Sequence, residues 1–301
     1  MPALLKAMRP HQWVKNVFVL AALVFWLAER FQLGDFSFAA HQGTIGRVAL
    51  ALIGFCLASS SIYLLNDILD REQDRQHPIK RHRPIAAGAV SIEAASALCV
   101  AAAVGALVLG WITSTDQGNV ALVLAAYMVL NLLYSLKLKH VVLVDVFCIA
   151  TGFMLRVVAG GFAAGAPVSK WLMLCTFFLA LFLALCKRKA EIDLLGSDRG
   201  EHRKILLEYT PAFLDQTTVV LAACAILNYT MYTVDRDTVA RLGDDLVWTV
   251  PFVVFGLFRY LLLVQKQEGG GSPSKVLLGG DVTFALNGLA WLAVVLFILF
   301  R

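Results

Sequence analysis

Oxygen-bearing side chains follow one another at helical spacing around residue 70. Asn66, Asp70 and Asp74 are four residues apart, and Asp67 stands three residues before Asp70. On a helix such side chains form one stripe, because residues three and four apart are neighbours on the helix surface. Carboxylates placed this closely repel one another, and a bound cation removes that cost. Oxygen ligands without histidine or cysteine favour Mg²⁺.

The stripe therefore predicts a metal site with a catalytic role. The alternative is a solvated helix end in which the aspartates pair with Arg71 and Arg75. Acidic residues at the end of a membrane helix are costly and usually functional, which favours the metal site. The expected metal ligands are Asn66, Asp70 and Asp74, and the expected catalytic residues are Asp67, Asp70 and Asp74.

A basic cluster follows the acidic stripe directly. Pro78 should break the helix, and Lys80, Arg81 and Arg83 come immediately after it. Such a pair of clusters suits a diphosphate substrate, since the metal bridges its oxygens and the cations neutralise the rest. The three cations could equally be the ordinary positive charge of a cytoplasmic loop, and both interpretations stay open.

The composition predicts a membrane protein. Of the 301 residues, 59% are hydrophobic and only 16% are charged, whereas a soluble domain carries roughly 25% charged residues. The apolar runs are continuous and long enough to cross a hydrocarbon core ~30 Å thick, so they predict helices rather than strands. The six cysteines contain no CxxC pair and fit small buried hydrophobes, neither disulfides nor metal ligands.

The apolar runs and the charge distribution together predict a topology. We expect an all-α integral membrane protein, a single domain over residues 1–301, with its N-terminus in the cytoplasm and its C-terminus outside. Most of the 26 lysines and arginines fall on the cytoplasmic side of this topology. The net charge of +5 is thereby explained without nucleic acid. The nine expected spans are 15–33, 47–69, 91–112, 118–136, 141–163, 170–187, 211–234, 246–265 and 282–300.

Two long polar loops and one flexible segment lie between these spans. The loops near residues 70–90 and 188–210 are both cytoplasmic in this topology and rich in charge, so we place the active site on the cytoplasmic side of the cell's inner (plasma) membrane. Residues 269–274 are glycine- and serine-rich and predict a flexible connector, although such a loop could also cover a phosphate.

The segment NDILDREQD, followed by HPIKRHRPIAAG, resembles the UbiA superfamily of membrane transferases. Members of that superfamily have nine transmembrane helices and an NDxxDxxxD motif that holds Mg²⁺ and a diphosphate. Asn66, Asp67, Asp70 and Asp74 match this motif position by position. The resemblance implies a nine-helix bundle and Mg²⁺ as the cofactor.

Three further segments are similar to one branch of the superfamily, the decaprenyl-phosphate phosphoribosyltransferases. Most prenyltransferases of the superfamily carry a second DxxxD motif after the sixth span, but residues 187–193 here read KRKAEID, similar to the KR-x-AE segment of that branch. Residues 9–16, RPHQWVKN, resemble its RPxQWxKN opening, and residues 134–139, YSLKLK, resemble its YS-x-x-LK segment.

This branch implies a specific reaction. Its members transfer 5-phosphoribosyl from phosphoribosyl pyrophosphate (PRPP) to a polyprenyl (decaprenyl) phosphate and release pyrophosphate, and the ribosyl lipid feeds cell-wall arabinan. Lys187 and Arg188 are our candidates to orient the lipid phosphate, with Lys15 and Lys139 next. The expected substrate-binding residues are Arg9, Gln12, Lys15, Asn16, Asn66, Asp67, Lys80, Arg81, Arg83, Tyr134, Lys139, Arg156, Lys187, Arg188 and Glu191.

Two of these residues have a second interpretation. Arg156 falls inside an expected span, where a buried arginine is costly unless it is paired or faces a wet cavity. It could bind a phosphate of the substrate, or it could pair with an acidic residue such as Asp145. Glu191 could bind the ribose hydroxyls or pair with Arg188.

Two other kinds of function remain as rivals. One is a prenyltransferase that moves a polyprenyl group from its diphosphate to an aromatic acceptor, which the missing second DxxxD motif disfavours. The other is a transporter or scaffold. Transporters place polar groups near the bilayer midplane, whereas this chain places its charge at cytoplasmic helix ends.

Overall fold

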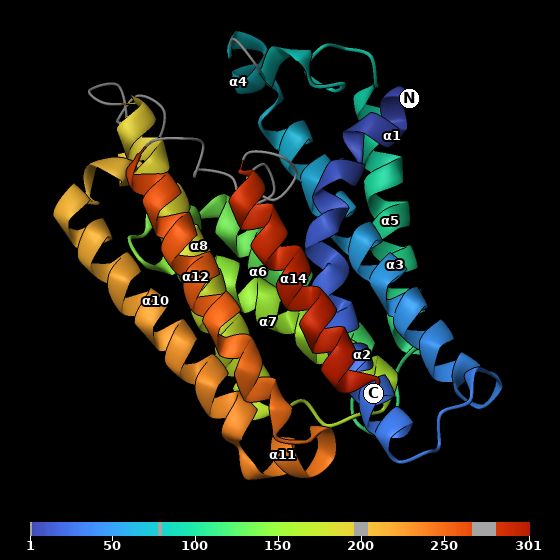
Figure 1. The fold of residues 1–301 in the computed structure, drawn as a ribbon. Coiled ribbons are helices and arrows are strands. Elements are labelled where there is room, and N and C mark those ends of the chain that lie inside the picture. The colour runs from blue at the N-terminus through green and yellow to red at the C-terminus, as the bar shows by residue number, and fades with distance from the viewer. Residues whose placement is uncertain (1, 78–79, 196–203, 267–280) are drawn as a thin grey trace. The chain divides into compact units, whose positions relative to one another are not determined.

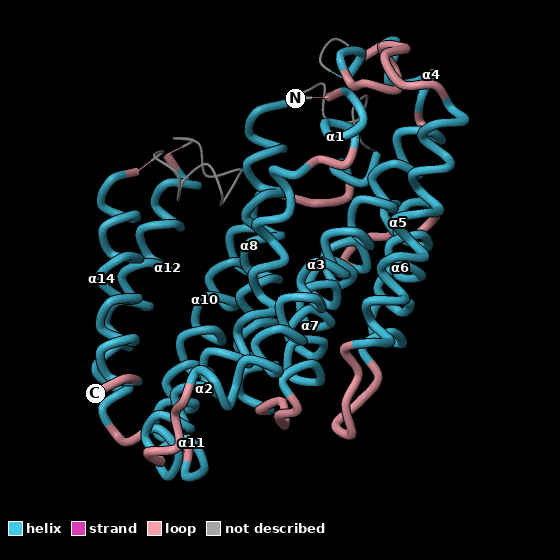
Figure 2. Tube along the Cα trace, turned by 90° about the vertical axis from the view of Figure 1, so that its right-hand side faces the viewer, coloured by secondary structure: helices cyan, strands magenta, loops and turns pink. Residues whose placement is uncertain are grey.

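The computed structural model describes residues 2–77, 80–195, 204–266 and 281–301. Figure 2 shows helices joined by loops, and within the described residues there is no strand beyond one isolated bridge between Thr115 and Gly118. The all-α expectation is thereby confirmed. Pro78 and the glycine-rich residues 269–274 lie outside the described residues, so the roles expected for them stay predictions.

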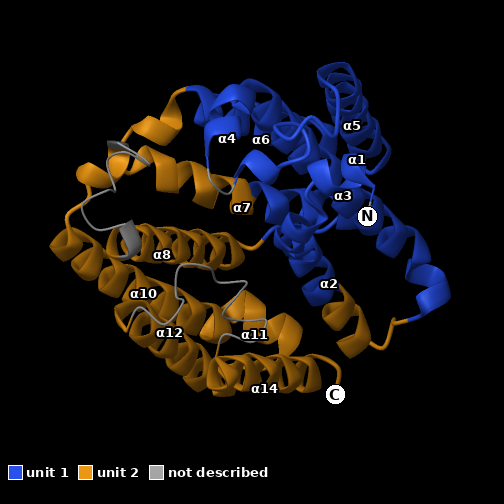
Figure 3. Ribbon diagram, turned by 90° about the horizontal axis from the view of Figure 1, so that it is seen from above, with its two compact units in different colours: residues 1–26, 37–136, 155–168 blue, residues 27–36, 137–154, 169–301 orange. Residues whose placement is uncertain are grey.

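Contacts between residues group the chain into two compact units, which are coloured separately in Figure 3. Unit 1 comprises residues 1–26, 37–136 and 155–168, and unit 2 comprises residues 27–36, 137–154 and 169–301. Two helices have residues in both units: α2 (Ala21–Gln32) and α7 (Val144–Ala164).

Unit 1 is built around one long helix, α3 (Phe38–Leu69), which packs along α5 (Ile92–Ile112) and α6 (Val120–Leu136) (Figure 1). Gly110 lets α5 and α6 approach closely, because a Cβ there would lie 2.8 Å from Cα of Ala121. The remaining elements of this unit are α1 (Ala3–Ala7), the 3₁₀ helix η1 (Pro10–Leu20), α4 (Arg71–Gln76) and the 3₁₀ turn η2 (Lys80–His82).

The N-terminal segment of unit 1 lies along α3. Trp13 Nε1 donates to Ser60 Oγ at 3.1 Å, and Ser60 Oγ donates to the carbonyl of Met8 at 3.0 Å. An eleven-residue 3₁₀ helix is unusually long, and Ser60 of α3 helps to hold it. The expected first span over residues 15–33 is therefore divided: its first part is η1 and its remainder is α2.

Unit 2 pairs α8 (Lys170–Leu195) with α10 (Pro211–Val234), which packs in turn on α12 (Val250–Gln265), while α12 packs on α14 (Val282–Leu299). Thr210 caps α10 by accepting from the backbone N–H of Phe213 at 3.2 Å, with Pro211 at the first helical position. Shorter elements are η3 (Leu138–His140), η5 (Lys204–Leu207), α11 (Arg236–Leu242) and η6 (Asp245–Thr249).

Seven of the described helices are long and apolar enough to cross a membrane, and α6 is apolar but shorter. Large apolar side chains stay exposed along them, for example Trp111, Leu122 and Phe297. Such surface is expected where lipid replaces water as the neighbour. The chain is thus a multi-pass membrane protein, while the count of nine spans and the orientation of the termini stay predictions.

Candidate functional site

Two buried carboxylates at the end of α3 share one guanidinium. Asp67 and Asp74 are each 2% exposed. Nη1 of Arg83 donates to Oδ1 of Asp67 at 3.1 Å and to Oδ2 of Asp74 at 2.6 Å. Arg9 forms a second ion pair with Asp67 Oδ1. The structure therefore brings four of the predicted site residues into one charged cluster, which we call the Asp67 cluster (Arg9, Asp67, Asp74 and Arg83).

The backbone explains why Asp67 and Asp74 face the same cation. Helix α3 ends at Leu69 and α4 begins at Arg71, with Asp70 between them. The amide of Asp70 still donates to the carbonyl of Asn66 at 2.9 Å, and that of Asp74 donates to the carbonyl of Asp70 at 2.8 Å. Helical pitch therefore continues across the junction, and residues seven apart stay on one face.

Arg9 reaches Asp67 from a strained backbone. Its φ of 54° lies in the left-handed region, directly before Pro10. Its guanidinium also sits 4.9 Å from the centre of the Tyr63 ring, close enough for a cation–π contact. A non-glycine residue in this region costs of order 1 kcal/mol or more and occurs disproportionately at functional sites. Arg9 and Arg83 remain partly exposed, with side chains 22% and 29% accessible, so an incoming anion can reach both.

The arginines within the acidic segment have other partners. Arg75 pairs with Glu72 at 3.0 Å, and Arg71 lies 3.9 Å from the same carboxylate. The solvated helix end, in which Arg71 and Arg75 neutralise the aspartates, is therefore not what the structure shows. Lys80 and Arg81 are exposed on η2.

The predicted Mg²⁺ ligands lie close together in sequence at the end of α3 and in α4. Asn66 and Asp70 are half-buried beside the Asp67 cluster, and their side chains make no hydrogen bond within the described residues. In the same described ranges, no three His, Cys, Asp or Glu side chains converge as in a preformed metal site. Two buried carboxylates nevertheless converge on one cation, and all candidate donors are hard oxygens. That donor set fits Mg²⁺, which takes its remaining ligands from phosphates and water.

Arg156 belongs to a buried polar network inside unit 1. Its Nε donates to Oδ1 of Asn16 at 2.8 Å, and its Nη2 donates to the hydroxyl of Tyr127 at 3.0 Å. The rings of Tyr127 and Phe55 also lie 4.8 and 5.6 Å from the guanidinium carbon. Asn16 is fully buried and donates to Ser59 Oγ at 3.3 Å, so this network holds η1 against α3.

A second charged cluster lies in unit 2, where Asp145 forms an ion pair with Arg188 and not with Arg156. Nε of Arg188 donates to Oδ2 of Asp145 at 3.0 Å, and its Nη1 donates to Oε2 of Glu191 at 2.6 Å. The hydroxyl of Tyr209 donates to Oδ1 of Asp145 at 2.7 Å. Lys187 lies 3.8 Å from Oε1 of Glu191. We call these five residues the Asp145 cluster.

The remaining predicted residues are dispersed over both units. Gln12 and Tyr134 are half-buried and Lys15 is exposed in unit 1, while Lys139 is half-buried in unit 2. The sequence reasoning missed Tyr209 altogether and considered Asp145 only as a partner for Arg156. One signal was present for Asp145, since an acidic residue at the start of a membrane helix is costly without a partner.

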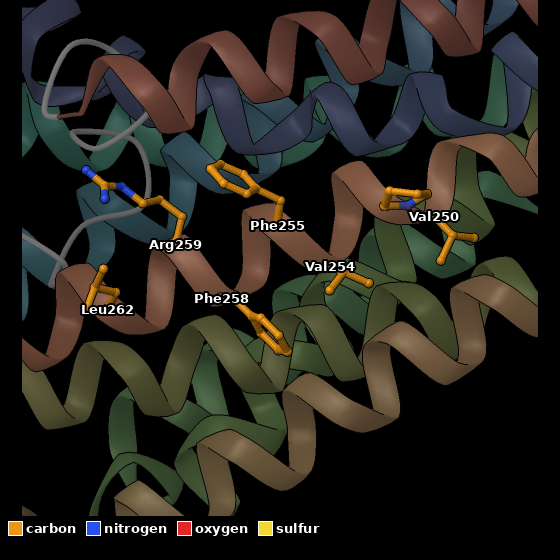
Figure 4. A pocket seen from close by; sticks show the side chains of 7 residues that line it. Val250, Val254, Phe255, Phe258, Arg259 and Leu262 are labelled. Carbon is orange, nitrogen blue, oxygen red and sulfur yellow. The ribbon is translucent and has the colours of Figure 1, made fainter.

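The α12 face of unit 2 carries a shallow apolar hollow (Figure 4) of about 540 Å³. Its single charged lining residue, Arg259, forms a two-bond ion pair with Asp281 at 3.1 and 2.6 Å. The hollow contains none of the predicted site residues. Its lining comes from one helix: Val250, Pro251, Val254, Phe255, Phe258, Arg259 and Leu262.

Comparison with known proteins identifies relatives over nearly the whole chain. The chain is 36% identical to a decaprenyl-phosphate phosphoribosyltransferase of Mycolicibacterium smegmatis, covering 97% of this chain and 91% of the relative. It is 38% identical to the enzyme of the same name from Corynebacterium glutamicum, covering 96% and 84%.

Solved structures share the fold. A UbiA homolog from Archaeoglobus fulgidus, bound to GPP and Mg²⁺, superposes with a TM-score of 0.70 at 18% identity and covers 99% of both chains. A UbiA homolog from Aeropyrum pernix reaches 0.65 at 15% identity, covering 95% and 98%. The profile of the UbiA prenyltransferase family matches residues 17–278. This match spans most of the sequence, and the chain belongs to the UbiA prenyltransferase family.

Proposed function

We propose that this protein transfers a 5-phosphoribosyl group from PRPP to a polyprenyl phosphate, with release of pyrophosphate. The observation that carries the proposal is the Asp145 cluster, at the place where prenyltransferases of the superfamily have their second acidic motif. Here α8 presents one exposed cation, Lys187, and one partly exposed carboxylate, Glu191, which is held from behind by the buried Arg188. Such a set suits an anion and a sugar better than a second metal-bound diphosphate. The identities of 36–38% to named decaprenyl-phosphate phosphoribosyltransferases support the same reaction.

The leaving pyrophosphate is assigned to the Asp67 cluster. The C1–O bond breaks with its electron pair on the pyrophosphate oxygen, so negative charge grows there. Arg9 and Arg83 are partly exposed guanidiniums that can donate paired hydrogen bonds to phosphate oxygens. Asp67 and Asp74, with Asn66 and Asp70, would hold Mg²⁺, which supplies further charge neutralisation.

The acceptor needs little activation. A lipid phosphate is already ionised at neutral pH, because its second pKa is ~6. One of its oxygens forms the new bond to C1 as the pyrophosphate leaves, and no proton has to move. Lys187 is exposed at the end of α8 and can orient such a phosphate without withdrawing much of its charge. Lys15 and Lys139 are the next candidates.

The setting of the reaction is proposed with it. The lipid acceptor requires a membrane enzyme, which agrees with the seven candidate spans among the described helices. We propose nine transmembrane helices in one transferase domain, with the N-terminus in the cytoplasm. By the positive-inside rule, the Asp67 cluster and the Asp145 cluster would then each face the cytoplasmic side of the plasma membrane. PRPP and Mg²⁺ would be supplied from that side.

A second candidate is prenyl transfer to an aromatic acceptor. It is favoured by the fold, since the Archaeoglobus fulgidus homolog has GPP and Mg²⁺ bound. Its donor would use the Asp67 cluster in the same way. The two candidates differ in what the Asp145 cluster recognises.

Competition between donors tests the proposal. Purified protein with Mg²⁺ receives a polyprenyl phosphate, labelled PRPP, and a prenyl diphosphate with 4-hydroxybenzoate. We expect label from PRPP in the lipid phase, no prenylated benzoate, and loss of transfer in EDTA. Prenylated benzoate without ribosyl lipid would overturn the proposal in favour of the second candidate.

A further inference from the structure

The Asp145 cluster forms a continuous series of hydrogen bonds from the backbone amide of Leu143 to a partly exposed carboxylate. The N–H of Leu143 donates to the hydroxyl of Tyr209 at 2.9 Å, and that hydroxyl donates to Asp145. Asp145 in turn accepts from Arg188, and Arg188 donates to Glu191. The residues come from the first turn of α7, the end of α8 and the segment before α10.

The residues of this hydrogen-bonded series differ in burial: some are enclosed and others are open to solvent. The side chains of Asp145 and Arg188 are 0% and 3% exposed, and Tyr209 is equally buried. Glu191 is 30% exposed and Lys187 is 53% exposed. The guanidinium of Arg188 already forms ion pairs with two carboxylates and is buried, so a ligand cannot reach it. The groups that can meet a ligand are therefore Glu191 and Lys187.

The backbone at the fixed end is strained. Leu143 has a φ of 66°, which is uncommon for a residue other than glycine, and its amide is the one bound by Tyr209. Burial, together with the hydrogen bond to Asp145, raises the pKa of Tyr209 above its usual range. The hydroxyl stays protonated and keeps donating to Asp145. Strain of this kind persists only where the surroundings hold it, and it concentrates at functional sites.

One carboxylate oxygen of Glu191 accepts a hydrogen bond within the cluster, and the other can accept one from a ligand. Oε2 accepts from Arg188 at 2.6 Å, whereas Oε1 lies 3.8 Å from the Lys187 nitrogen, too far for a hydrogen bond. A carboxylate oxygen held in this way accepts hydrogen bonds from neutral donors such as the vicinal hydroxyls of a sugar. The nearby Lys187 ammonium remains the candidate for the phosphate of the lipid acceptor, which attacks the same sugar.

We propose that Asp145 and Tyr209 are positioning residues that act through Arg188 to present Glu191 to the hydroxyls of a phosphorylated pentose. This inference rests on the proposed function for the identity of the sugar donor and adds which residues select it. Arg188 then contributes to recognition only through Glu191. Asp145 and Tyr209 themselves touch no substrate.

Equilibrium binding of two probes tests this selection without any transfer step. The dissociation constants of ribose 5-phosphate and 2-deoxyribose 5-phosphate are measured by calorimetry for the full-length protein in detergent. A charge-assisted hydrogen bond to one hydroxyl contributes roughly 1.5–3 kcal/mol, so the wild-type protein should prefer ribose 5-phosphate by about tenfold or more. Glu191→Gln should reduce this preference to about twofold.

Tyr209→Phe is the decisive variant, because it keeps the ring and removes only the hydroxyl. We expect it to lower the preference for ribose 5-phosphate several-fold, and to change nothing further in the Glu191→Gln background, since coupled residues are not additive. Tyr229→Phe is the matched control. It removes another hydrogen-bonded tyrosine hydroxyl of unit 2, one that contacts Thr249 and Trp291, and should leave the preference unchanged.

The outcomes separate the two proposals. A preference that survives Tyr209→Phe, or falls equally in Tyr229→Phe, overturns the positioning role. A wild-type protein with no preference for ribose overturns the assignment of Glu191. Ribosyl transfer from PRPP is measured on the same preparations: its absence overturns the proposed function, while the binding result stands on its own.

Discussion

Asp67 and Asp74, seven residues apart, accept hydrogen bonds from the same nitrogen, Nη1 of Arg83, at 3.1 and 2.6 Å. Two buried carboxylates would repel each other strongly without a cation between them. Arg83 supplies that cation from a side chain that is still partly open to solvent. A divalent ion held by the same oxygens would therefore compete with this guanidinium, which in turn would be released to bind the substrate's phosphates.

Removal of the Arg83 guanidinium should strengthen the binding of a divalent metal and weaken the binding of the substrate. Arg83→Gln is expected to bind Mn²⁺ alone several-fold more tightly, measured by electron paramagnetic resonance, and to raise the KM for PRPP about tenfold or more. The control is Arg75→Gln, which removes a nearby arginine that pairs with Glu72 instead. Equal Mn²⁺ affinity in wild type and Arg83→Gln would show that Arg83 does not share the metal's ligands.

Asp70 should be essential for activity yet dispensable for stability. Its side chain is half-buried and makes no hydrogen bond within the described residues, so Asp70→Asn removes a charge without breaking an ion pair. We expect at least a hundredfold loss of transfer, about 2.7 kcal/mol of transition-state stabilisation, with an unchanged melting temperature in detergent. Asp116→Asn, at an exposed position of unit 1, serves as the control. Transfer at the wild-type rate would remove Asp70 from the site.

Asn16 should act on stability more than on substrate binding. It is fully buried between Arg156 and Ser59, so Asn16→Ala leaves a buried guanidinium nitrogen without its acceptor. A buried polar group that loses its partner costs roughly 1–3 kcal/mol. We expect a melting temperature several degrees lower, measured by thermal unfolding in detergent, and little change for the exposed control Gln73→Ala. A normal melting temperature combined with a raised KM would instead indicate direct contact with substrate.

The Arg259–Asp281 pair should stabilise α14 only above acidic pH. The hydrogen bond from Arg259, with the backbone N–H of Phe284, holds the pKa of Asp281 below its usual range. The carboxylate's contribution is therefore present above its unfolded pKa of ~3.9 and is lost as the pH falls through the lower folded value. Asp281→Asn should melt below the wild type at pH 7, and the difference should shrink below about pH 4. A difference that persists in strong acid would contradict this origin.

Local patterns in the sequence were sufficient to predict the side of the helix on which Asp67 and Asp74 meet. They share a face because the α-helical period brings residues seven apart together, and the structure places both on Arg83. The apolar runs likewise predicted the membrane helices to within a few residues at most ends. Hydrophobicity, however, does not distinguish a 3₁₀ helix from an α-helix, so the division between η1 and α2 was missed.

Pairings between distant helices could not be predicted in this way. Arg188 and Asp145 are 43 residues apart, and Arg156 and Asn16 are 140 apart. No local period connects such positions, and only the packing of the helices selects the partner. Tyr209 was missed for the same reason, since a single tyrosine before a capped helix carries no signal until its hydroxyl is seen on Asp145.

The most direct test of the proposed reaction follows both halves of the donor. PRPP carrying ¹⁴C in the ribose and ³²P in the β-phosphate is incubated with purified protein, Mg²⁺ and a polyprenyl phosphate. We predict ¹⁴C in the lipid phase and an equal amount of ³²P released as aqueous pyrophosphate, with both lost in EDTA. Retention of ¹⁴C in the aqueous phase, under conditions where a prenyl diphosphate is consumed, would contradict ribosyl transfer and leave the Asp67 cluster serving a prenyl donor.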